Sequence, residues 1–227
     1  MISPDTTVAD LVTDRPARAR IFERLGIDYC CGGDHSLAEA ARKNDLDPET
    51  VVQMLDAATD ASSPVDATDW TDAALGDLID HIESTHHEYL RRELPRLERL
   101  LTRVAQAHGA QVPWTHDVLD VFLDLKTDLE KHMQSEEKQV FPSIRRLAEQ
   151  EADDIDQDGI EQMIDEHDEA GAALEQLRDL SNDFTPPENA CPKFRAAMDG
   201  LRELEVDMHQ HVHKENNILF PRARSLA

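Results

Sequence analysis

His132-Met-Gln-Ser-Glu136-Glu-Lys-Gln-Val-Phe141-Pro142 is repeated later in the chain as His211-Val-His-Lys-Glu215-Asn-Asn-Ile-Leu-Phe220-Pro221. Both copies follow the pattern His-x3-Glu-x4-Phe-Pro. A His and a Glu four residues apart on a helix point from the same face, one turn apart. The repeat therefore predicts two helices that each present an imidazole and a carboxylate together.

Each copy also continues an apolar stripe. The stripes have the three-and-four spacing of a helix face that is turned toward a bundle core. Imidazoles and carboxylates on such a face need partners, because burying an unpaired charge costs several kcal/mol. A dinuclear metal centre would supply those partners. The stripes consist of Val118, Phe122, Leu125 and Leu129 before the first copy, and of Phe194, Ala197, Leu201, Leu204 and Met208 before the second.

Composition and charge limit the class of protein. Aromatic residues make up only 4% of the 227 residues, and the abundance of Ala, Leu, Asp, Glu and Arg favours an all-α fold. The net charge of −25 argues against nucleic acid or an anionic membrane surface as a partner. Acidic residues outnumber basic ones by 48 to 23, and Lys is scarce, which favours a halophilic protein from a salt-loaded cytoplasm.

No targeting or membrane-spanning segment is expected. The sequence has no run of about 18 apolar residues, so we expect no transmembrane helix. Its first residues, Met1-Ile-Ser-Pro-Asp, lack the basic region and apolar region of a signal peptide. We therefore expect a cytoplasmic protein.

The chain divides at a polar, proline-containing stretch, residues 59–70, which we interpret as a linker. Residues 1–58 are expected to form a small helical domain. Residues 71–227 carry four long helical patterns with short connections, which predicts an up-down four-helix bundle. The proline that ends each copy of the motif should kink its helix. The four patterns cover residues 71–107, 115–149, 157–182 and 190–222.

The first and third helices should supply the remaining ligands, because two His and two Glu leave a dinuclear site short of donors. His167 continues the apolar stripe of the third helix. The first helix offers His81, His86 and His87. Its apolar stripe favours His86, whereas the spacing of the repeat favours His87, so these observations leave both open.

The donor set indicates the metal. Four imidazoles with two carboxylates suit iron or manganese, and imidazole shifts the preference toward iron. Zinc is the main rival, but structural zinc prefers one closed tetrahedral site with thiolate ligands. The other histidines are placed at the surface (His35, His81, His108 and His116) or on a helix face away from the core (His209 and His213).

On these residues the chain resembles the iron-centre repair proteins, also called RIC or YtfE/ScdA proteins. Residues 1–58 resemble their N-terminal domain, with Gly26-Ile-Asp-Tyr-Cys-Cys-Gly-Gly as the double-cysteine motif, and residues 71–225 resemble their hemerythrin-like domain. The resemblance places the first ligand at His87 rather than His86. It implies a centre of two iron ions whose ligands are His87, His132, His167 and His211, with Glu136 and Glu215 as bridges.

The resemblance also implies a function, the repair of iron-sulfur clusters damaged by nitric oxide or oxidative stress, by iron donation to the damaged proteins. The alternative is a di-iron protein that binds or reduces nitric oxide, and a third possibility is oxygen binding or sensing. Oxygen-carrying hemerythrins have two further ligands, where this chain has Gly171 and Asn216. A less complete ligand set does not suit a dedicated oxygen carrier.

Cys30 and Cys31 are the candidate thiol site. Adjacent cysteines rarely form a relaxed disulfide, because the small ring strains the backbone. They could instead pair across a homodimer formed through the N-terminal domain, ligate iron, act as redox-active thiols in an exposed loop, or simply pack. Cys191, in a proline-rich loop, is expected to be unimportant.

Overall fold

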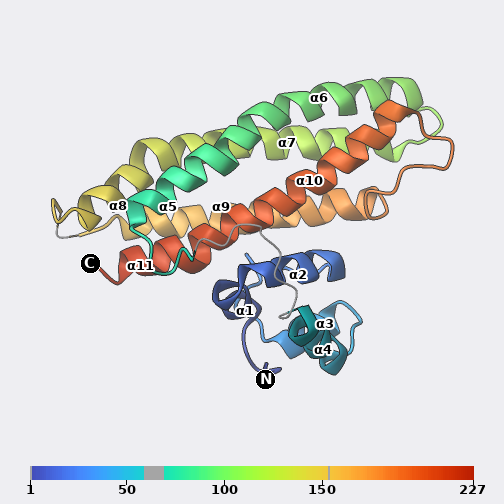
Figure 1. Cartoon of the computed structure of the whole chain (residues 1–227). Helices are drawn as coiled ribbons and strands as arrows, with labels where there is room; N and C mark the ends of the chain where they lie inside the picture. The colour runs from blue at the N-terminus through green and yellow to red at the C-terminus, as the bar shows by residue number, and fades with distance from the viewer. Residues whose placement is uncertain (1, 59–68, 153) are drawn as a thin grey trace. The chain divides into compact units, whose positions relative to one another are not determined.

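The computed structural model describes residues 2–58, 69–152 and 154–227. Its elements in these ranges are helices (Figure 1). One isolated antiparallel bridge joins Thr7 and Ser36 in the described residues. The all-α prediction is therefore confirmed. Most of the expected linker, residues 59–68 of 59–70, lies outside the described residues, so this domain boundary stays a prediction. Among the helices that are described, none is both long enough and apolar enough to cross a membrane.

The described residues belong to two compact units. One contains the described residues up to Leu78 together with His209–Leu226, and the other contains the described residues from Ile79 to Met208 together with Ala227. The sequence did not indicate that a C-terminal segment would belong to the same unit as the N-terminal helices.

Local signals set the ends of the N-terminal helices. The Ser36 hydroxyl accepts a hydrogen bond from the Glu39 backbone N–H at 3.2 Å, and the Glu39 carboxylate accepts one from the Ser36 N–H at 3.1 Å, which confirms the capping box. Gly26 ends a helix in the left-handed conformation, with φ of 66°. The helices are α1 (Val8–Asp14), η1 (Pro16–Arg18), α2 (Ala19–Leu25), α3 (Leu37–Lys43) and α4 (Pro48–Ala58).

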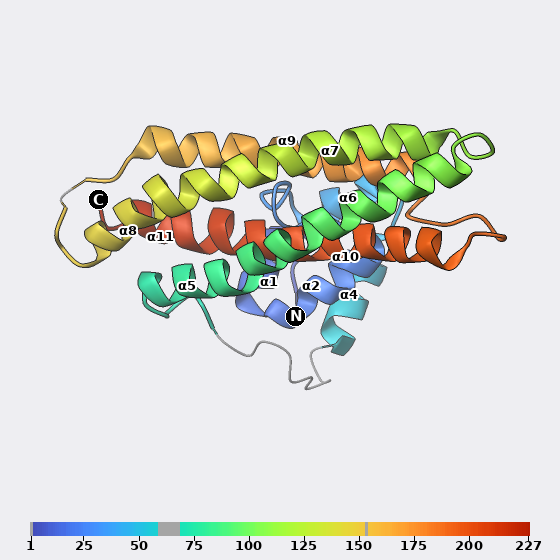
Figure 2. The same ribbon diagram turned by 90° about the horizontal axis from the view of Figure 1, so that it is seen from above.

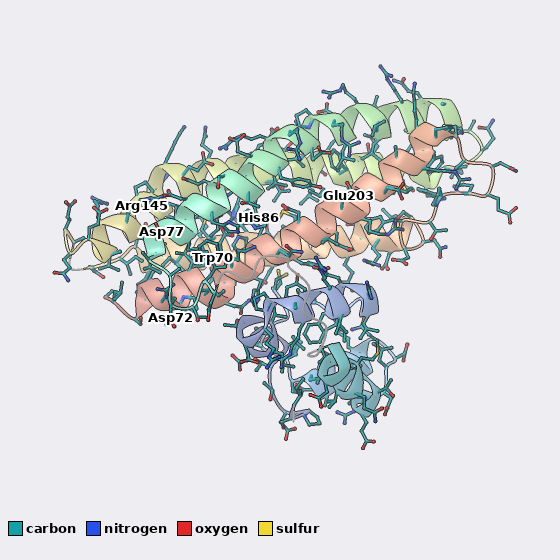
Figure 3. The ribbon with its side chains drawn as sticks, in the orientation of Figure 1. Trp70, Asp72, Asp77, His86, Arg145 and Glu203 are labelled. Atoms are coloured by element: carbon teal, nitrogen blue, oxygen red, sulfur yellow. The ribbon has the colours of Figure 1, made fainter. Side chains whose placement is uncertain are left out.

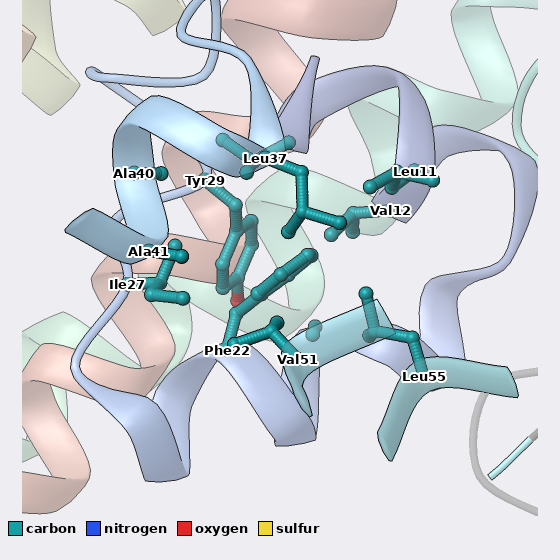
Figure 4. Close-up of a cluster of buried hydrophobic side chains, with 12 residues drawn as sticks. Leu11, Val12, Phe22, Ile27, Tyr29, Leu37, Ala40, Ala41, Val51 and Leu55 are labelled. Atoms are coloured by element: carbon teal, nitrogen blue, oxygen red, sulfur yellow. The ribbon is translucent and has the colours of Figure 1, made fainter. Parts of the chain in front are cut away.

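These helices enclose a small apolar core. Phe22 and Tyr29 lie at its centre and are completely buried, with leucine and valine side chains from α1, α3 and α4 around them (Figure 4). Gly33 is required by the packing, because a Cβ atom there would lie 2.8 Å from the Ala9 Cβ and from the Tyr29 carbonyl oxygen. The core thus fixes the loop between α2 and α3, which carries both adjacent cysteines.

The second unit is a four-helix bundle. Figures 1 and 2 show its helices running side by side, with consecutive helices in opposite directions. This confirms the predicted up-down bundle. Its helices are α6 (Glu88–His108), α7 (Trp114–Ser135), α9 (Gln157–Leu180) and residues 192–208 of α10 (Pro192–Lys214).

The predicted apolar stripes form the bundle core, since every one of their residues is at most 4% exposed. Helices α6 and α10 approach closely at Gly200, where a Cβ atom would lie 2.6 Å from the Leu97 Cδ2. Arg178 on α9 donates to Glu205 on α10 with an Nε–Oε1 distance of 2.9 Å. Packing and this ion pair therefore join the fourth helix to the other helices.

In the part of the chain that the structure describes, three π-helical turns interrupt the long helices. They are η2 (Glu83–His87) between α5 (Leu75–Ile82) and α6, η3 (Glu136–Val140) between α7 and α8 (Phe141–Ala148), and η4 (Glu215–Leu219) between α10 and α11 (Phe220–Arg224). A π turn is rare and often marks a functional position. The sequence predicted proline kinks at two of these positions but no π turn.

Candidate metal centre

The six sequence-predicted ligands are all buried, each at most 4% exposed. They lie within long helices or at the ends of π turns. His87 is the last residue of η2, and Glu136 and Glu215 are the first residues of η3 and η4. The other three ligands, His132, His167 and His211, lie within α7, α9 and α10.

The six side chains form two overlapping groups. In each group, one possible ligand atom of every residue lies within 4.8 Å of those of the others. Both groups contain two imidazoles, and both contain Glu136 and Glu215. This arrangement can hold two cations side by side. The groups are His87, Glu136, His211 and Glu215, and His132, Glu136, His167 and Glu215.

The inward atoms of the histidines are their Nε2 nitrogens. His87 Nε2 lies 3.3 Å from Glu136 Oε2, and His132 Nε2 lies 3.4 Å from Glu136 Oε1. The two oxygens of Glu136 therefore face different imidazoles. His211 Nε2 lies 3.1 Å from Glu215 Oε1. Imidazole nitrogens and carboxylate oxygens are donors suited to iron.

Carboxylates outside the two groups hold the outer nitrogens of two imidazoles. His87 Nδ1–H donates to Glu137 Oε1 at 2.6 Å, and His132 Nδ1–H donates to Glu166 Oε2 at 2.7 Å. A carboxylate can only accept, so each bond fixes the tautomer that leaves the Nε2 lone pair directed inward. Metal-binding histidines are held by such partners in general.

Glu137 and Glu166 are themselves anchored. Glu137 accepts from Arg91, and Glu166 accepts from the Gln162 amide at 2.7 Å. Burial raises the pKa of Glu137, but hydrogen bonds from His87 and Arg91 outweigh this effect, and the pKa is lowered overall. Sequence reasoning assigned no role to either Glu. The sequence could have indicated them, because each lies next to a candidate ligand. Glu137 follows Glu136, and Glu166 precedes His167.

The π turns account for the Phe-Pro element of the motif. The N–H of Phe141 donates to the Glu136 carbonyl, and the N–H of Phe220 donates to the Glu215 carbonyl, five residues back in each case. A proline ring clashes with the carbonyl four residues before it in an ordinary helix. The wider π turn before each proline leaves room for that ring, and it begins at the candidate bridging carboxylate.

His86 and His87 are both buried, but the structure places them differently. His87 belongs to the first metal-binding group, whereas His86 belongs to neither group. His86, which is labelled in Figure 3, instead has a partner on the fourth helix. Its Nδ1–H donates to Asp207 Oδ1 at 2.9 Å. Through this hydrogen bond, His86 in η2 is joined to Asp207 in α10.

The two adjacent cysteines are both thiols, with Sγ atoms 3.6 Å apart. Cys30 is 5% exposed and Cys31 is half-buried. Cys191 lies elsewhere, 3.3 Å from His108 Nε2. Residues 209 and 213 were expected to face away from the bundle core. Their imidazole rings contact the ring of Tyr29, with centroids 5.8 and 5.5 Å apart.

Comparison with known proteins yields two domain families and a set of full-length relatives. Residues 78–223 match the hemerythrin HHE cation-binding domain, and residues 4–59 match the ScdA N-terminal domain, a domain of unknown function. The iron-sulfur cluster repair protein ScdA of Staphylococcus haemolyticus is 34% identical over 97% of this chain and 98% of its own length. The iron-sulfur cluster repair proteins YtfE of Dickeya chrysanthemi and Escherichia coli are 36% and 35% identical, over 96% of each chain.

Proposed function

Because the chain belongs to the family of iron-sulfur cluster repair proteins, we propose that its hemerythrin-like domain holds two iron ions and donates iron to damaged iron-sulfur proteins. Nitric oxide and oxidative stress are the proposed sources of the damage. The proteins that carry the damaged clusters are then its partners.

The observation that carries this proposal is that Glu136 and Glu215 belong to both metal-binding groups. We infer that both carboxylates bridge the two ions. Glu136 suits this role, because its two oxygens lie 3.3 and 3.4 Å from different imidazoles. His87 and His211 would complete the site of one ion, and His132 and His167 the site of the other. Iron bound there would supply a cation that can exchange between the ferrous and ferric states.

The number of ligands supports donation over permanent storage. Two imidazoles and two shared carboxylates for each ion leave further coordination positions to exchangeable ligands, as in other open His-carboxylate iron sites. Gly171, four residues after His167, and Asn216, beside Glu215, offer neither an imidazole nor a carboxylate to close those positions. An incompletely enclosed ion is easier to transfer.

The same open positions support the alternative, a protein that binds nitric oxide or reduces it to nitrous oxide. Two neighbouring ferrous ions could supply the two electrons of that reduction. Oxygen binding or sensing would use the same positions. These gas ligands, a cytoplasmic location and a homodimer through residues 1–58 stay predictions.

Anaerobic assays on the iron-loaded full-length protein test the proposal. One arm follows iron transfer to an apo iron-sulfur protein by the absorption of the cluster formed when sulfide is supplied. The other arm adds nitric oxide and measures nitrous oxide in the gas phase. We expect transfer that requires Glu136 and Glu215, with His116→Ala, an exposed histidine, as the matched control. If no iron is transferred and nitrous oxide forms in stoichiometric amounts, iron donation is wrong and nitric oxide reduction is supported instead.

A further inference from the structure

Another group of side chains that could hold a metal ion lies within the unit that contains the N-terminal helices and residues 209–226. Asp28, Cys30 and His209 each contribute one possible ligand atom to a group whose atoms lie within 4.8 Å of one another. None of them belongs to the candidate metal centre. This group contains a sulfur donor beside a carboxylate and an imidazole, whereas the candidate metal centre contains only imidazoles and carboxylates.

Contacts outside the group hold the loop after α2 against α10 and η4. The Tyr29 ring packs edge-on against the rings of His209 and His213. The amide of Asn217 donates to the Cys30 carbonyl oxygen at 3.4 Å. Residues 180 to 187 positions apart in the chain are therefore brought together by contacts other than those among the three candidate ligand atoms. A preorganised group loses less entropy when it binds an ion.

Binding of a cation would change the protonation or the hydrogen bonding of the ligand atoms in this group. The Cys30 thiol donates to Asp28 Oδ1 at 3.1 Å. Burial raises the pKa of Cys30 well above its ordinary value, so the sulfur keeps its proton until a cation replaces it. The Nδ1 atom of His209 is buried and has no hydrogen-bond partner among the described residues. An unsatisfied buried polar atom costs free energy.

We propose that Asp28, Cys30 and His209 bind one divalent cation of borderline softness. Thiolate and imidazole donors favour iron, cobalt or zinc over magnesium and calcium. Three protein ligands leave the fourth position of a tetrahedral ion open, as in sites that exchange a ligand. Binding releases the Cys30 proton to solvent and forms a sulfur–metal bond. Cys31 lies outside the group, although its Sγ is 3.6 Å from that of Cys30.

Ferrous iron is the cation that this site takes in the cell, an assignment that rests on the proposed function. His209 precedes the candidate ligand His211 by two residues on α10. Asp28 and His209 are partly exposed, whereas all six side chains of the candidate metal centre are buried. A partly exposed site with an open position is suited to hold an ion that is being loaded or handed to a client protein.

Cobalt(II) titration of the metal-free, reduced full-length protein tests this site. A thiolate-to-cobalt charge-transfer band in the near ultraviolet reports a cysteine ligand, which the candidate metal centre cannot provide. We expect this band to saturate at one ion per chain and to be lost in Cys30→Ser. His209→Gln and Asp28→Asn should weaken cobalt binding at this site roughly tenfold or more. Cys31→Ser and Cys191→Ser should keep the band, and added ferrous iron should remove it by competition.

The outcomes separate this inference from the proposed function. A wild-type protein that binds cobalt without the band, or a band that persists in Cys30→Ser, would overturn the site. Failure of ferrous iron to compete would overturn the assignment to iron. Glu136→Gln with Glu215→Gln should lose the other bound ions and keep the band. If this double variant keeps both the band and the other bound ions, the site at Cys30 is supported and the candidate metal centre is wrong. Circular dichroism of each variant confirms that it is folded.

Discussion

His167 and His132 face each other through their Nε2 atoms, which lie 2.9 Å apart. His132 Nδ1–H donates to Glu166, so His132 Nε2 is an acceptor, and His167 Nε2–H must donate to it. If His167 instead carried its proton on Nδ1, both Nε2 lone pairs would be directed at the space between the two imidazoles, where a cation could bind. The close approach of these imidazoles therefore suits a pair of ligands for one cation.

Metal binding should stabilise the folded protein. Glu136 and Glu215 are completely buried, and a cation between them would offset the cost of burying two negative charges. At iron concentrations about 100 times the dissociation constant, the gain for one site is about 2.7 kcal/mol. Thermal unfolding followed by circular dichroism, with ferrous iron and with chelator under anaerobic conditions, measures it. Equal Tm values in both conditions would contradict a metal centre at these carboxylates.

Loss of a shared carboxylate should cost more metal than loss of one imidazole. Glu136 belongs to both groups, whereas His87 belongs to one. Iron analysis should therefore give almost no iron in Glu136→Ala and about half the wild-type content in His87→Ala. His86→Gln, which changes a buried histidine outside both groups, is the control and should retain its iron. If His86→Gln loses its iron and His87→Ala keeps it, then His86 and not His87 is the ligand from the first helix.

The outer carboxylates should tune affinity without changing stoichiometry. Glu166→Gln weakens the acceptor for His132 Nδ1–H, and Glu137→Gln does the same for His87. Each should lower iron affinity by about 10- to 100-fold, measured by competition with a chelator, while saturating iron still fills both sites. Glu169→Gln, an exposed position on the same helix as Glu166, is the matched control. If both variants bind iron as tightly as the control, Glu166 and Glu137 do not contribute to metal binding.

The close approach of α6 and α10 should make Gly200 intolerant of a side chain. In Gly200→Ala the new methyl group would lie 2.6 Å from Leu97 Cδ2, and overpacking of this kind typically costs about 1–3 kcal/mol. Urea unfolding measures the loss. Asp199→Ala removes an exposed ion pair with Arg202 at 3.4 Å on the same helix turn, and it should change stability by less than about 1 kcal/mol. An unchanged midpoint in Gly200→Ala would show that the helices can separate at little cost.

Helical periodicity made most of the bundle predictable from sequence. Each stripe and each His-x3-Glu pair is defined by residues three or four apart, and this spacing brings them to one face of a helix whatever surrounds it. The buried stripe from Val118 to Leu129 and the burial of His132 with Glu136 follow from that local rule. Capping residues such as Ser36 and Gly26 were readable for the same reason, since a cap involves only neighbours in the chain.

The sequence by itself determined the helices, their apolar faces and the six candidate ligands, because these depend on short-range spacing and on the donor chemistry of the side chains. The tertiary structure placed His87, and not His86, in a metal-binding group, as the family resemblance implied, and it alone showed which carboxylates hold the outer nitrogens of the imidazoles. It alone placed Cys30 beside His209. Such contacts join residues that are far apart in the chain, and they depend on helix phase after a π turn and on packing, neither of which leaves a periodic signal in the sequence.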